Sequence, residues 1–352
     1  MINQSAFDQK VIGLSKAFHP ANATFEITNH CNASCGYCYI KHERLNDDLS
    51  LHDLQRVVDK LHEAGVLFLC ITGGEPFIRP DIAPFLEYCV KKNFFKISIL
   101  TNGTLLSDDH FALLSRNRDY FSYVKISVFS HIPEIHDAYC GIANAFRTIV
   151  DNAMKIKRSG VDVFFSLNVL DFNCETIELT KKYFENIGFT VWDSFPKVIN
   201  SSNLGQAIRP MTTRDFYTRY LRGTPKENVL AYQDGLKEKM TDPNRESELC
   251  IGLYSTIHIN SSGDILPCFS FRKFKIGNIL GEPSLPRLLR ESKAYDHLRS
   301  MKKTDIPACG ECSYLNFCQP CIGLIHSEFE GFDRAPDQLC NFQKALHEMR
   351  YD

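Results

Sequence analysis

The fold is decided by the stretch Thr24-Phe-Glu-Ile-Thr28-Asn-His-Cys31-Asn-Ala-Ser-Cys35-Gly-Tyr-Cys38. It opens with a β-rich run and passes directly into a loop with the cysteine spacing C-x3-C-x2-C. Three thiolates within eight residues can hold three irons of a cubane 4Fe-4S cluster, since thiolates are the usual ligands of such clusters. Zinc is the alternative, but structural zinc normally closes with a fourth Cys or His, for which His30 and His42 are nearby candidates. If the metal is a cluster, one iron is left open.

Beyond this loop the chain alternates short β-rich runs with longer segments of helical periodicity, the pattern of parallel βα units. Six units are too few for a complete eight-unit barrel. The sequence therefore predicts an α/β fold, a partial (β/α)6 TIM-like barrel, followed by a small cysteine-rich domain with a β-hairpin. The six strands are expected at residues 24–28, 66–72, 96–101, 123–129, 161–169 and 189–195.

Helix signals support this division. A helix over residues 51–64 follows Ser50, with Asp53 placed as in a capping box. Two later helices are expected to end at Gly160 and Gly188, because glycine readily takes the left-handed conformation that closes a helix. The single Trp192 is expected in the core. We expect an N-terminal extension over 1–22, the barrel over 23–199, a connecting region over 200–249 with a helix near 213–221, and the cysteine-rich domain over 250–352.

Composition narrows the class of protein. With 352 residues, 44% apolar, 23% charged and a net charge of −2, the chain reads as an ordinary globular protein. This gives no electrostatic case for binding nucleic acid or an anionic membrane. No signal peptide or membrane span is apparent, so a cytoplasmic location is expected. Fourteen cysteines in such a chain favour metal binding over disulfides.

Three further motifs lie where predicted strands end. Gly73-Gly74-Glu75-Pro76 follows the second strand, Thr101-Asn102-Gly103 ends the third, and Ser127 lies in the fourth. Glycines let the backbone approach a ligand closely and expose carbonyls to an ammonium group, while a nearby carboxylate favours positive charge. The plainer readings are a simple turn for the glycine motif and a strand-end cap for Ser127.

Together these motifs resemble the radical S-adenosylmethionine (SAM) superfamily, whose cysteine loop carries an aromatic residue before its last cysteine, here Tyr37. The resemblance implies that Cys31, Cys35 and Cys38 hold the SAM-binding cluster. It also implies that Gly73, Gly74, Glu75 and Pro76 take the SAM amino group, with Asn102 and Ser127 also close to SAM. The chain departs from the family at Val128-Phe129-Ser130, where many members carry Asp or Tyr and then Gly. An electron from a reductant such as flavodoxin or ferredoxin would cleave SAM, and the 5'-deoxyadenosyl radical would abstract a hydrogen atom from the substrate.

A second set of cysteines lies toward the C-terminus. Cys250 and Cys268 bracket Gly263 in the spacing C-x12-G-x4-C, and two CxxC pairs and a final cysteine follow. Paired CxxC units also suit a zinc ribbon. After a radical SAM barrel, the order resembles the SPASM domain, which houses auxiliary 4Fe-4S clusters, and residues 257–268 with 276–279 match its hairpin.

The resemblance assigns these cysteines to two auxiliary clusters, giving three 4Fe-4S clusters in all. Seven cysteines leave one iron without a cysteine ligand, and that iron either binds substrate or serves in an electron relay. Two residues rather than the commoner three separate Cys318 from Cys321, which weakens the assignment of Cys321. The outer cluster would take Cys309, Cys312, Cys318 and Cys340, and the inner one Cys250, Cys268 and Cys321.

The remaining four cysteines are expected to be small buried apolar residues. The exception considered is Cys140, which follows His136-Asp137 in an expected loop above the barrel and is a candidate hydrogen-atom donor. The other three are Cys70, Cys89 and Cys174.

The resemblance implies a peptide-modifying enzyme that crosslinks, forms thioethers, epimerises or oxidises during ribosomal peptide maturation. The short segment before the first strand is too small for a leader-binding domain, so a separate leader-binding protein or the barrel itself would bind the leader. One alternative is a dehydrogenase acting on a small molecule or on a protein Ser or Cys, similar to sulfatase maturases. Another is a non-catalytic iron-sulfur or zinc scaffold.

Overall fold

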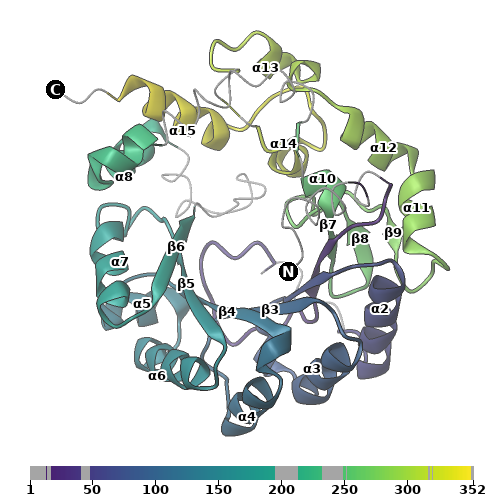
Figure 1. The fold of residues 1–352 in the computed structure, drawn as a ribbon. Helices are drawn as coiled ribbons and strands as arrows, with labels where there is room; N and C mark the ends of the chain where they lie inside the picture. Colours follow the sequence, from purple (N-terminus) through teal and green to yellow (C-terminus); the bar gives the residue numbers. More distant parts are fainter. Residues whose placement is uncertain are drawn as a thin grey trace.

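The computed structural model describes residues 13, 17–40, 48–194, 213–231, 249–250, 252–315, 318 and 320–349. At its centre, parallel strands lie side by side in sequence order, and helices cover the outside of the curved sheet (Figure 1). The predicted α/β partial barrel is therefore confirmed. Its strands are β1 (Asn22–Glu26), β2 (Phe68–Thr72), β3 (Lys96–Thr101), β4 (Phe121–Val128), β5 (Asp162–Asn168) and β6 (Thr190–Ser194).

Helices and short 3-10 turns connect these strands. Ser50 caps α2 by accepting a hydrogen bond from the backbone N–H of Asp53, as predicted. Gly160 and Gly188 both have a φ of +84° just beyond the helices that they close. The elements are α2 (Leu51–Glu63), η2 (Pro76–Ile78), α3 (Ile82–Lys91), α4 (Asp108–Arg116), η3 (Arg118–Tyr120), α5 (Pro133–Cys140), α6 (Ala145–Arg158) and α7 (Ile177–Asn186).

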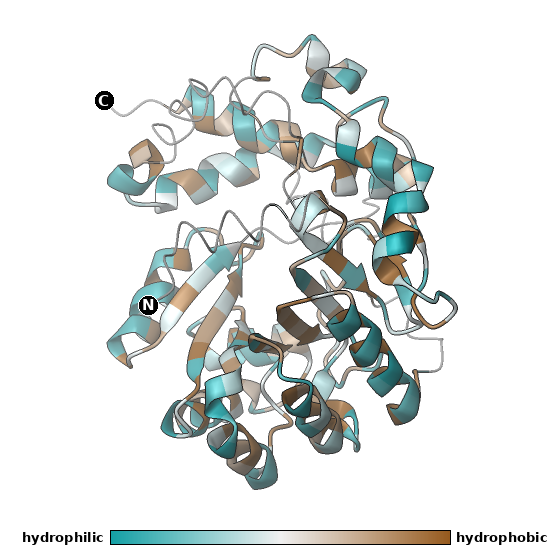
Figure 2. Ribbon diagram, turned by 45° about the vertical axis from the view of Figure 1, so that its right-hand side comes forward, coloured by the Kyte–Doolittle hydropathy of each residue, from teal (hydrophilic) through white to brown (hydrophobic). Residues whose placement is uncertain are grey.

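Strand alternation separates the two faces of the sheet. In β4, Val124 and Ile126 point toward the helices and are fully buried in the main apolar core. The residues between them, Tyr123, Lys125 and Ser127, lie on the opposite, inner face and are half-buried. The helices present apolar residues toward the strands and polar residues outward (Figure 2). The inner face is thus the part of the sheet that its own helices do not cover.

The predicted hairpin does not form a separate sheet. Strand β7 (Thr256–Ile259) pairs in parallel with β1, and β8 (Asp264–Leu266) and β9 (Gly277–Asn278) follow antiparallel. The described strands therefore form one sheet in the order β6-β5-β4-β3-β2-β1-β7-β8-β9. The C-terminal cysteine-rich region is continuous with the barrel at its β1 edge.

The rest of the C-terminal region is helical and has a second apolar core that includes Leu253, Phe271, Leu298 and Ile325. Helix α15 packs against α8, the helix predicted near residues 213–221 (Figure 1). These elements are α8 (Arg214–Gly223), α10 (Gly252–Ser255), α11 (Leu285–Glu291), α12 (Lys293–Ser300), η5 (Lys303–Asp305), α13 (Pro307–Gly310), α14 (Ile322–Phe329) and α15 (Asp337–Glu348).

The strand predictions agree closely with the structure, since β3 spans the predicted residues and each other strand begins and ends within two residues of its prediction. Trp192 is the exception to the predicted core, because it lies on the inner face and is 44% exposed. Residues 1–12, His42 and most of the connecting region lie outside the described residues. Within the described chain, no helix combines the length and apolar character that crossing a membrane requires.

Candidate active site

The cysteine loop follows β1 at the carboxyl end of the parallel strands. Its three thiols form one group: burial raises the pKa of Cys35 to about 12, and the nearby thiols of Cys38, Cys140 and Cys31 add to this. A buried thiol with such a pKa needs a nearby cation to be held as the thiolate. An iron-sulfur cluster supplies that positive charge, so the loop fits the group that the sequence implies.

Two donors point at the first thiol of the loop. The backbone N–H of Ala33 lies 3.3 Å from Cys31 Sγ, and the Nδ2 of Asn102 lies 3.8 Å from it. Asn102 also donates to Asn32 Oδ1 at 2.8 Å and accepts from the N–H of Thr104 at 2.9 Å. The end of β3 therefore holds the cysteine loop directly, and donors to sulfur are one means by which proteins tune such clusters.

Glycine is required at the first two positions of the Gly-Gly-Glu-Pro motif because the backbone there lies too close to the same loop to leave room for a Cβ atom. A Cβ on Gly74 would lie 2.1 Å from the carbonyl oxygen of His30, and one on Gly73, whose φ is +143°, would lie 2.4 Å from that of Thr28. The N–H of Gly74 donates to Thr28 and that of Glu75 to His30, both at 2.8 Å. The motif is therefore part of the support of the cysteine loop and not a free turn.

Glu75 has a structural task that sequence reasoning did not anticipate. It is fully buried, and its carboxylate accepts from Thr101 Oγ1 at 2.7 Å and from the N–H groups of Asn102 at 2.6 Å and Phe77 at 3.0 Å. Burial raises the pKa of Glu75 to about 7, although these donors act in the opposite direction. The carboxylate thus fixes the ends of β2 and β3 against each other.

The other residues expected near SAM lie around the same end of the sheet. Tyr37 stacks on Tyr139 with ring centroids 6.2 Å apart, and its hydroxyl accepts from Asn168 Nδ2 at 3.0 Å. Ser127 lies opposite Ser166 of β5, on the inner face. Tyr37 therefore links the cysteine loop to the end of β5, next to the strand face that carries Ser127.

Cys140 does not lie in a loop, so that prediction was wrong. It is the last residue of α5 and is 4% exposed, and its Sγ lies 3.5 Å from the carbonyl oxygen of Asp137. Its own carbonyl accepts from the N–H of Ser34 at 2.8 Å. Two sequence signals mark this helix, Pro133 in its first turn and Gly141 at its end. The position suits support of the cysteine loop, while the thiol has little exposed surface from which to reach a substrate.

The scattered cysteines differ in burial. Cys89 and Cys174 are almost fully buried, as expected, whereas Cys70 is half-buried on β2.

A buried polar group that no sequence motif indicates lies between the barrel and the hairpin. Glu26 of β1 is fully buried and contacts Tyr39 Oη at 3.1 Å, His258 Nε2 of β7 at 3.1 Å, and both Nη atoms of Arg272 at 2.8 and 3.1 Å. Burial alone would raise the pKa of Glu26, but His258 and Arg272 outweigh it and lower the pKa to about 2. We name Glu26, Tyr39, His258 and Arg272 the junction group.

The junction group connects three separate parts of the chain. Tyr39 directly follows the last cysteine of the loop, and the guanidinium of Arg272 lies 5.2 Å from its ring centroid. His258 and Arg272 belong to the C-terminal region. The ionised Glu26 therefore ties the cysteine loop to the hairpin segment through one charge network.

The C-terminal cysteines gather into two groups. In the inner one, burial raises the pKa of Cys268 to about 12, with Cys321 and Cys250 close enough to raise it further. In the outer one, burial raises the pKa of Cys318 to about 12, and the nearby thiols are Cys309, Cys340 and Cys312. Cys268 therefore lies near Cys250 and Cys321, and Cys318 lies near Cys309, Cys312 and Cys340. Among the described residues, no three His, Cys, Asp or Glu side chains are arranged so that they could hold a single metal ion.

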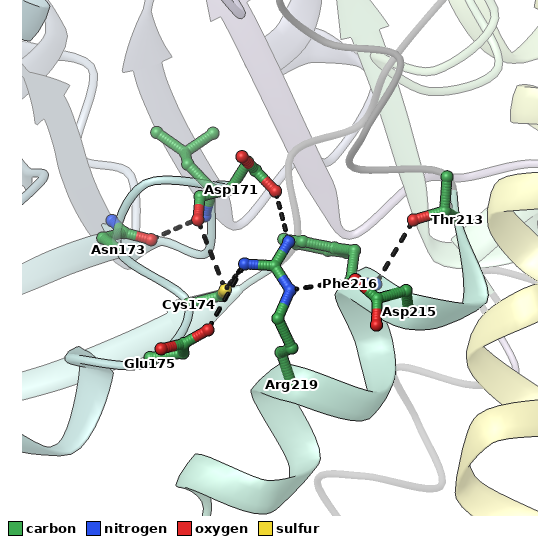
Figure 3. Close-up of polar contacts among 9 residues, drawn as sticks. Asp171, Asn173, Cys174, Glu175, Thr213, Asp215, Phe216 and Arg219 are labelled. Carbon is green, nitrogen blue, oxygen red and sulfur yellow. Dashed lines mark hydrogen bonds and ion pairs between the residues drawn. The ribbon is translucent and has the colours of Figure 1, made fainter.

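Helix α8 is fastened to the loop after β5 by one arginine (Figure 3). Arg219 contacts Asp171 at 2.5 Å, Asp215 at 3.2 Å, Glu175 at 3.4 Å and the Sγ of Cys174 at 3.5 Å. Because α15 packs on α8 and carries Cys340, this clamp connects the β5 end of the barrel to the outer cysteine group.

Comparison with known proteins agrees with this architecture. A profile of the radical SAM superfamily matches residues 25–184, and one of the SPASM iron-sulfur cluster-binding domain matches residues 250–313. The solved structure of anSMEcpe with bound AdoMet and the Cp18Cys peptide has a TM-score of 0.69 at 18% identity and covers 94% of this chain and 96% of its own. At that identity it supports the fold.

Two curated relatives differ in their described roles. The antilisterial bacteriocin subtilosin biosynthesis protein AlbA of Bacillus subtilis is 27% identical over 263 residues, which is 74% of this chain but 57% of AlbA. The AdoMet-dependent heme synthase of Oleidesulfovibrio alaskensis is 23% identical over 350 residues, covering 91% of this chain and 86% of that protein. The two profile matches, together with the cysteine loop and the strand-end motifs, show that this chain contains a radical SAM domain followed by a SPASM domain.

Proposed function

We propose that this chain is a radical SAM enzyme that abstracts a hydrogen atom from a peptide and so matures it. The observation that carries the proposal is the convergence of Cys31, Gly74 and Asn102 at the carboxyl end of the strands, held there by Glu75. A zinc or iron-sulfur scaffold without catalysis would leave this construction of three strand ends around one loop without a purpose.

Each residue of the site has a separate task in the proposed reaction. Cys31, Cys35 and Cys38 would hold the SAM-binding 4Fe-4S cluster, and the glycine motif would offer backbone carbonyls to the SAM ammonium group. When bound and reduced, SAM and the cluster supply the 5'-deoxyadenosyl radical that takes the hydrogen atom. The inner face of the barrel would orient the substrate and keep water away from it.

The two C-terminal cysteine groups would hold auxiliary 4Fe-4S clusters, so the proposed enzyme carries three clusters. A reductant such as flavodoxin or ferredoxin would supply the electron, and a separate leader-binding protein remains part of the proposal. With fourteen free cysteines, a reducing compartment such as the cytoplasm suits the chain.

The proposed substrate class rests on the peptide-related relatives, AlbA by its described role and anSMEcpe by the peptide in its structure. Crosslinking, thioether formation, epimerisation and oxidation are all compatible with the site. The length of the heme synthase match supports a second candidate, radical chemistry on a tetrapyrrole. Product mass separates the classes: a peptide product appears in one case and a changed tetrapyrrole in the other.

The first test is anaerobic reconstitution with iron and sulfide, followed by iron counting and a dithionite-driven SAM cleavage assay. About twelve irons per chain and 5'-deoxyadenosine formation are expected. A Cys31→Ala, Cys35→Ala, Cys38→Ala variant should lose both the deoxyadenosine and about four irons, while a Cys70→Ala control keeps them. If the fully reconstituted protein binds zinc or never cleaves SAM, the enzyme proposal is rejected and the non-catalytic scaffold is favoured.

A further inference from the structure

The inner face of β4, β5 and β6 carries an aromatic surface. Trp192 is 44% exposed and stacks on Phe164, with ring centroids 4.4 Å apart and an interplanar angle of 17°. Tyr123 meets both rings edge-on, at 5.5 and 5.8 Å. These three residues come from three neighbouring strands, and none of them belongs to the cysteine loop or its supports. Exposed stacked rings of this kind bind apolar side chains at little cost in conformational entropy.

A lysine lies within this aromatic surface. The Nζ of Lys125 is 6.0 Å from the ring centroid of Trp192, and burial lowers the pKa of Lys125 while the nearby Cys70 thiol acts in the opposite direction. Within the described residues it has no carboxylate partner. By contrast, Lys181 of helix α7, on the helical side of the sheet, pairs with Asp193 at 2.8 Å and Glu178 at 3.1 Å. Because this ammonium group is partly desolvated and has no carboxylate partner among the described residues, a ligand carboxylate that pairs with it would bind favourably.

The position of this surface relates it to the reaction. Lys125 lies two residues before Ser127 on the same face of β4. It is therefore about 6.6 Å farther than Ser127 from the carboxyl end of the strand. Asn168, two residues beyond Ser166, joins the end of β5 to Tyr37 of the cysteine loop. A molecule lying on the aromatic surface would therefore extend along the strands toward the cysteine loop.

We propose that Tyr123, Lys125, Phe164 and Trp192, the aromatic-lysine surface, bind an acidic side chain of the peptide substrate together with an adjacent apolar side chain. The carboxylate pairs with Lys125, and the apolar neighbour lies on Trp192 and Phe164. The inference deepens the proposed function, on which its peptide substrate rests, by naming a substrate feature that the barrel selects.

Trp192 makes the proposal directly measurable, because it is the single tryptophan of the chain. Its emission in the reconstituted enzyme is titrated with the blocked peptide acetyl-Gly-Ala-Leu-Glu-Leu-Ala-Gly-amide and with its Gln counterpart. The Glu peptide should change the emission and bind at least about tenfold more tightly than the Gln peptide. Lys125→Met should remove the preference and Lys125→Arg should retain it.

The matched control is Lys155→Met, since Lys155 also lies over a ring, that of Phe111 at 5.1 Å, but on the helical side of the sheet. It should leave the preference intact. Equal binding of the Glu and Gln peptides, or an unchanged preference in Lys125→Met, would overturn the proposal. So would a Lys125-dependent response to SAM alone, or preferential binding of a Gln peptide with a free C-terminal carboxylate.

Deoxyadenosine formation in the same samples keeps the two proposals apart. SAM cleavage without an acid preference rejects the aromatic-lysine surface and leaves the enzyme. An acid preference without SAM cleavage rejects the enzyme and leaves the surface as a peptide-binding site.

Discussion

Arg272 and Glu26, which are 246 residues apart in the chain, form a two-pronged ion pair in which Nη1 donates to Oε1 and Nη2 to Oε2. Both side chains are almost completely buried, at 5% and 0% exposure. The pair joins the first barrel strand to the segment after the C-terminal hairpin. Its geometry satisfies both carboxylate oxygens, which is the condition under which a buried charge is tolerated.

Substituting Arg272→Met should destabilise the protein by about 3–5 kcal/mol, because it leaves a buried carboxylate with less compensation. Equilibrium denaturation by urea measures the change. The double variant Glu26→Gln, Arg272→Met should be more stable than the Arg272→Met single variant, since no charge is then left unpaired. A double variant that loses the sum of the two single losses would contradict this reading.

The junction group also predicts a pH dependence. Because the pKa of Glu26 is lowered to about 2 from 4.5, its ionised form stabilises the fold at pH values above 4.5. That contribution, roughly 3 kcal/mol, is lost as the pH falls from about 5 toward 2. Unfolding midpoints of the iron-free protein across this range should therefore fall more steeply for wild type than for Glu26→Gln. Parallel curves would place the acid-sensitive group elsewhere.

Gly74→Ala should selectively remove the SAM-binding cluster, because the added Cβ would meet the carbonyl oxygen of His30 at 2.1 Å. Iron analysis after reconstitution should show a loss of about four irons, with the auxiliary clusters retained. Gly36→Ala is the matched control within the cysteine loop, since its Cβ would meet its nearest neighbour, Tyr139 Oη, at 3.7 Å. Equal iron loss in both variants would show that the site tolerates no added side chain, and that the close contact of Gly74 with His30 is not the cause.

The two C-terminal cysteine groups can be separated by single substitutions. Cys268→Ser should disturb the inner auxiliary cluster and Cys340→Ser the outer one, because each thiol lies with a different set of partners. Electron paramagnetic resonance of the dithionite-reduced proteins should then lack different signals. If Cys321→Ser removes the same signal as Cys340→Ser, the grouping of Cys321 is wrong.

Arg219→Ala should loosen α8 and, through it, α15. The substitution leaves Asp171, Glu175 and Asp215 close together without their shared cation. Hydrogen exchange should become faster in both helices and stay unchanged in α2. Arg222→Ala, on the same helix, serves as the control and should not reproduce the effect.

The features that follow from local pattern could be predicted from the sequence. The strand ends and the Ser50 cap both depend on residues that lie close together in the chain. The loop expected at Cys140 is instead the end of a helix, whose local signals are Pro133 in its first turn and Gly141 at its end. Trp192 was placed in the core because sequence pattern does not say which face of a curved sheet its own helices cover.

The features that depend on distant pairing could not be predicted. Nothing near Glu26 in the sequence indicates that Arg272 will neutralise it. The same holds for the parallel pairing of β1 with β7, because a hairpin motif does not indicate which other strand the hairpin will join. Glu75 could be predicted only in part. The sequence shows its motif, but it does not show that both carboxylate oxygens accept hydrogen bonds from Thr101 and from backbone N–H groups.

The pairing of Asn22 with Thr256 and of Phe25 with Ile259 also has a consequence for synthesis on the ribosome. At about 5–20 residues per second, strand β1 emerges roughly 10 to 50 seconds before the strand that completes its outer edge. During that interval the nascent barrel exposes an unpaired strand edge beside its cysteine loop, and such edges promote aggregation. Chaperone protection of the nascent chain would matter most in this interval, before the hairpin covers the edge.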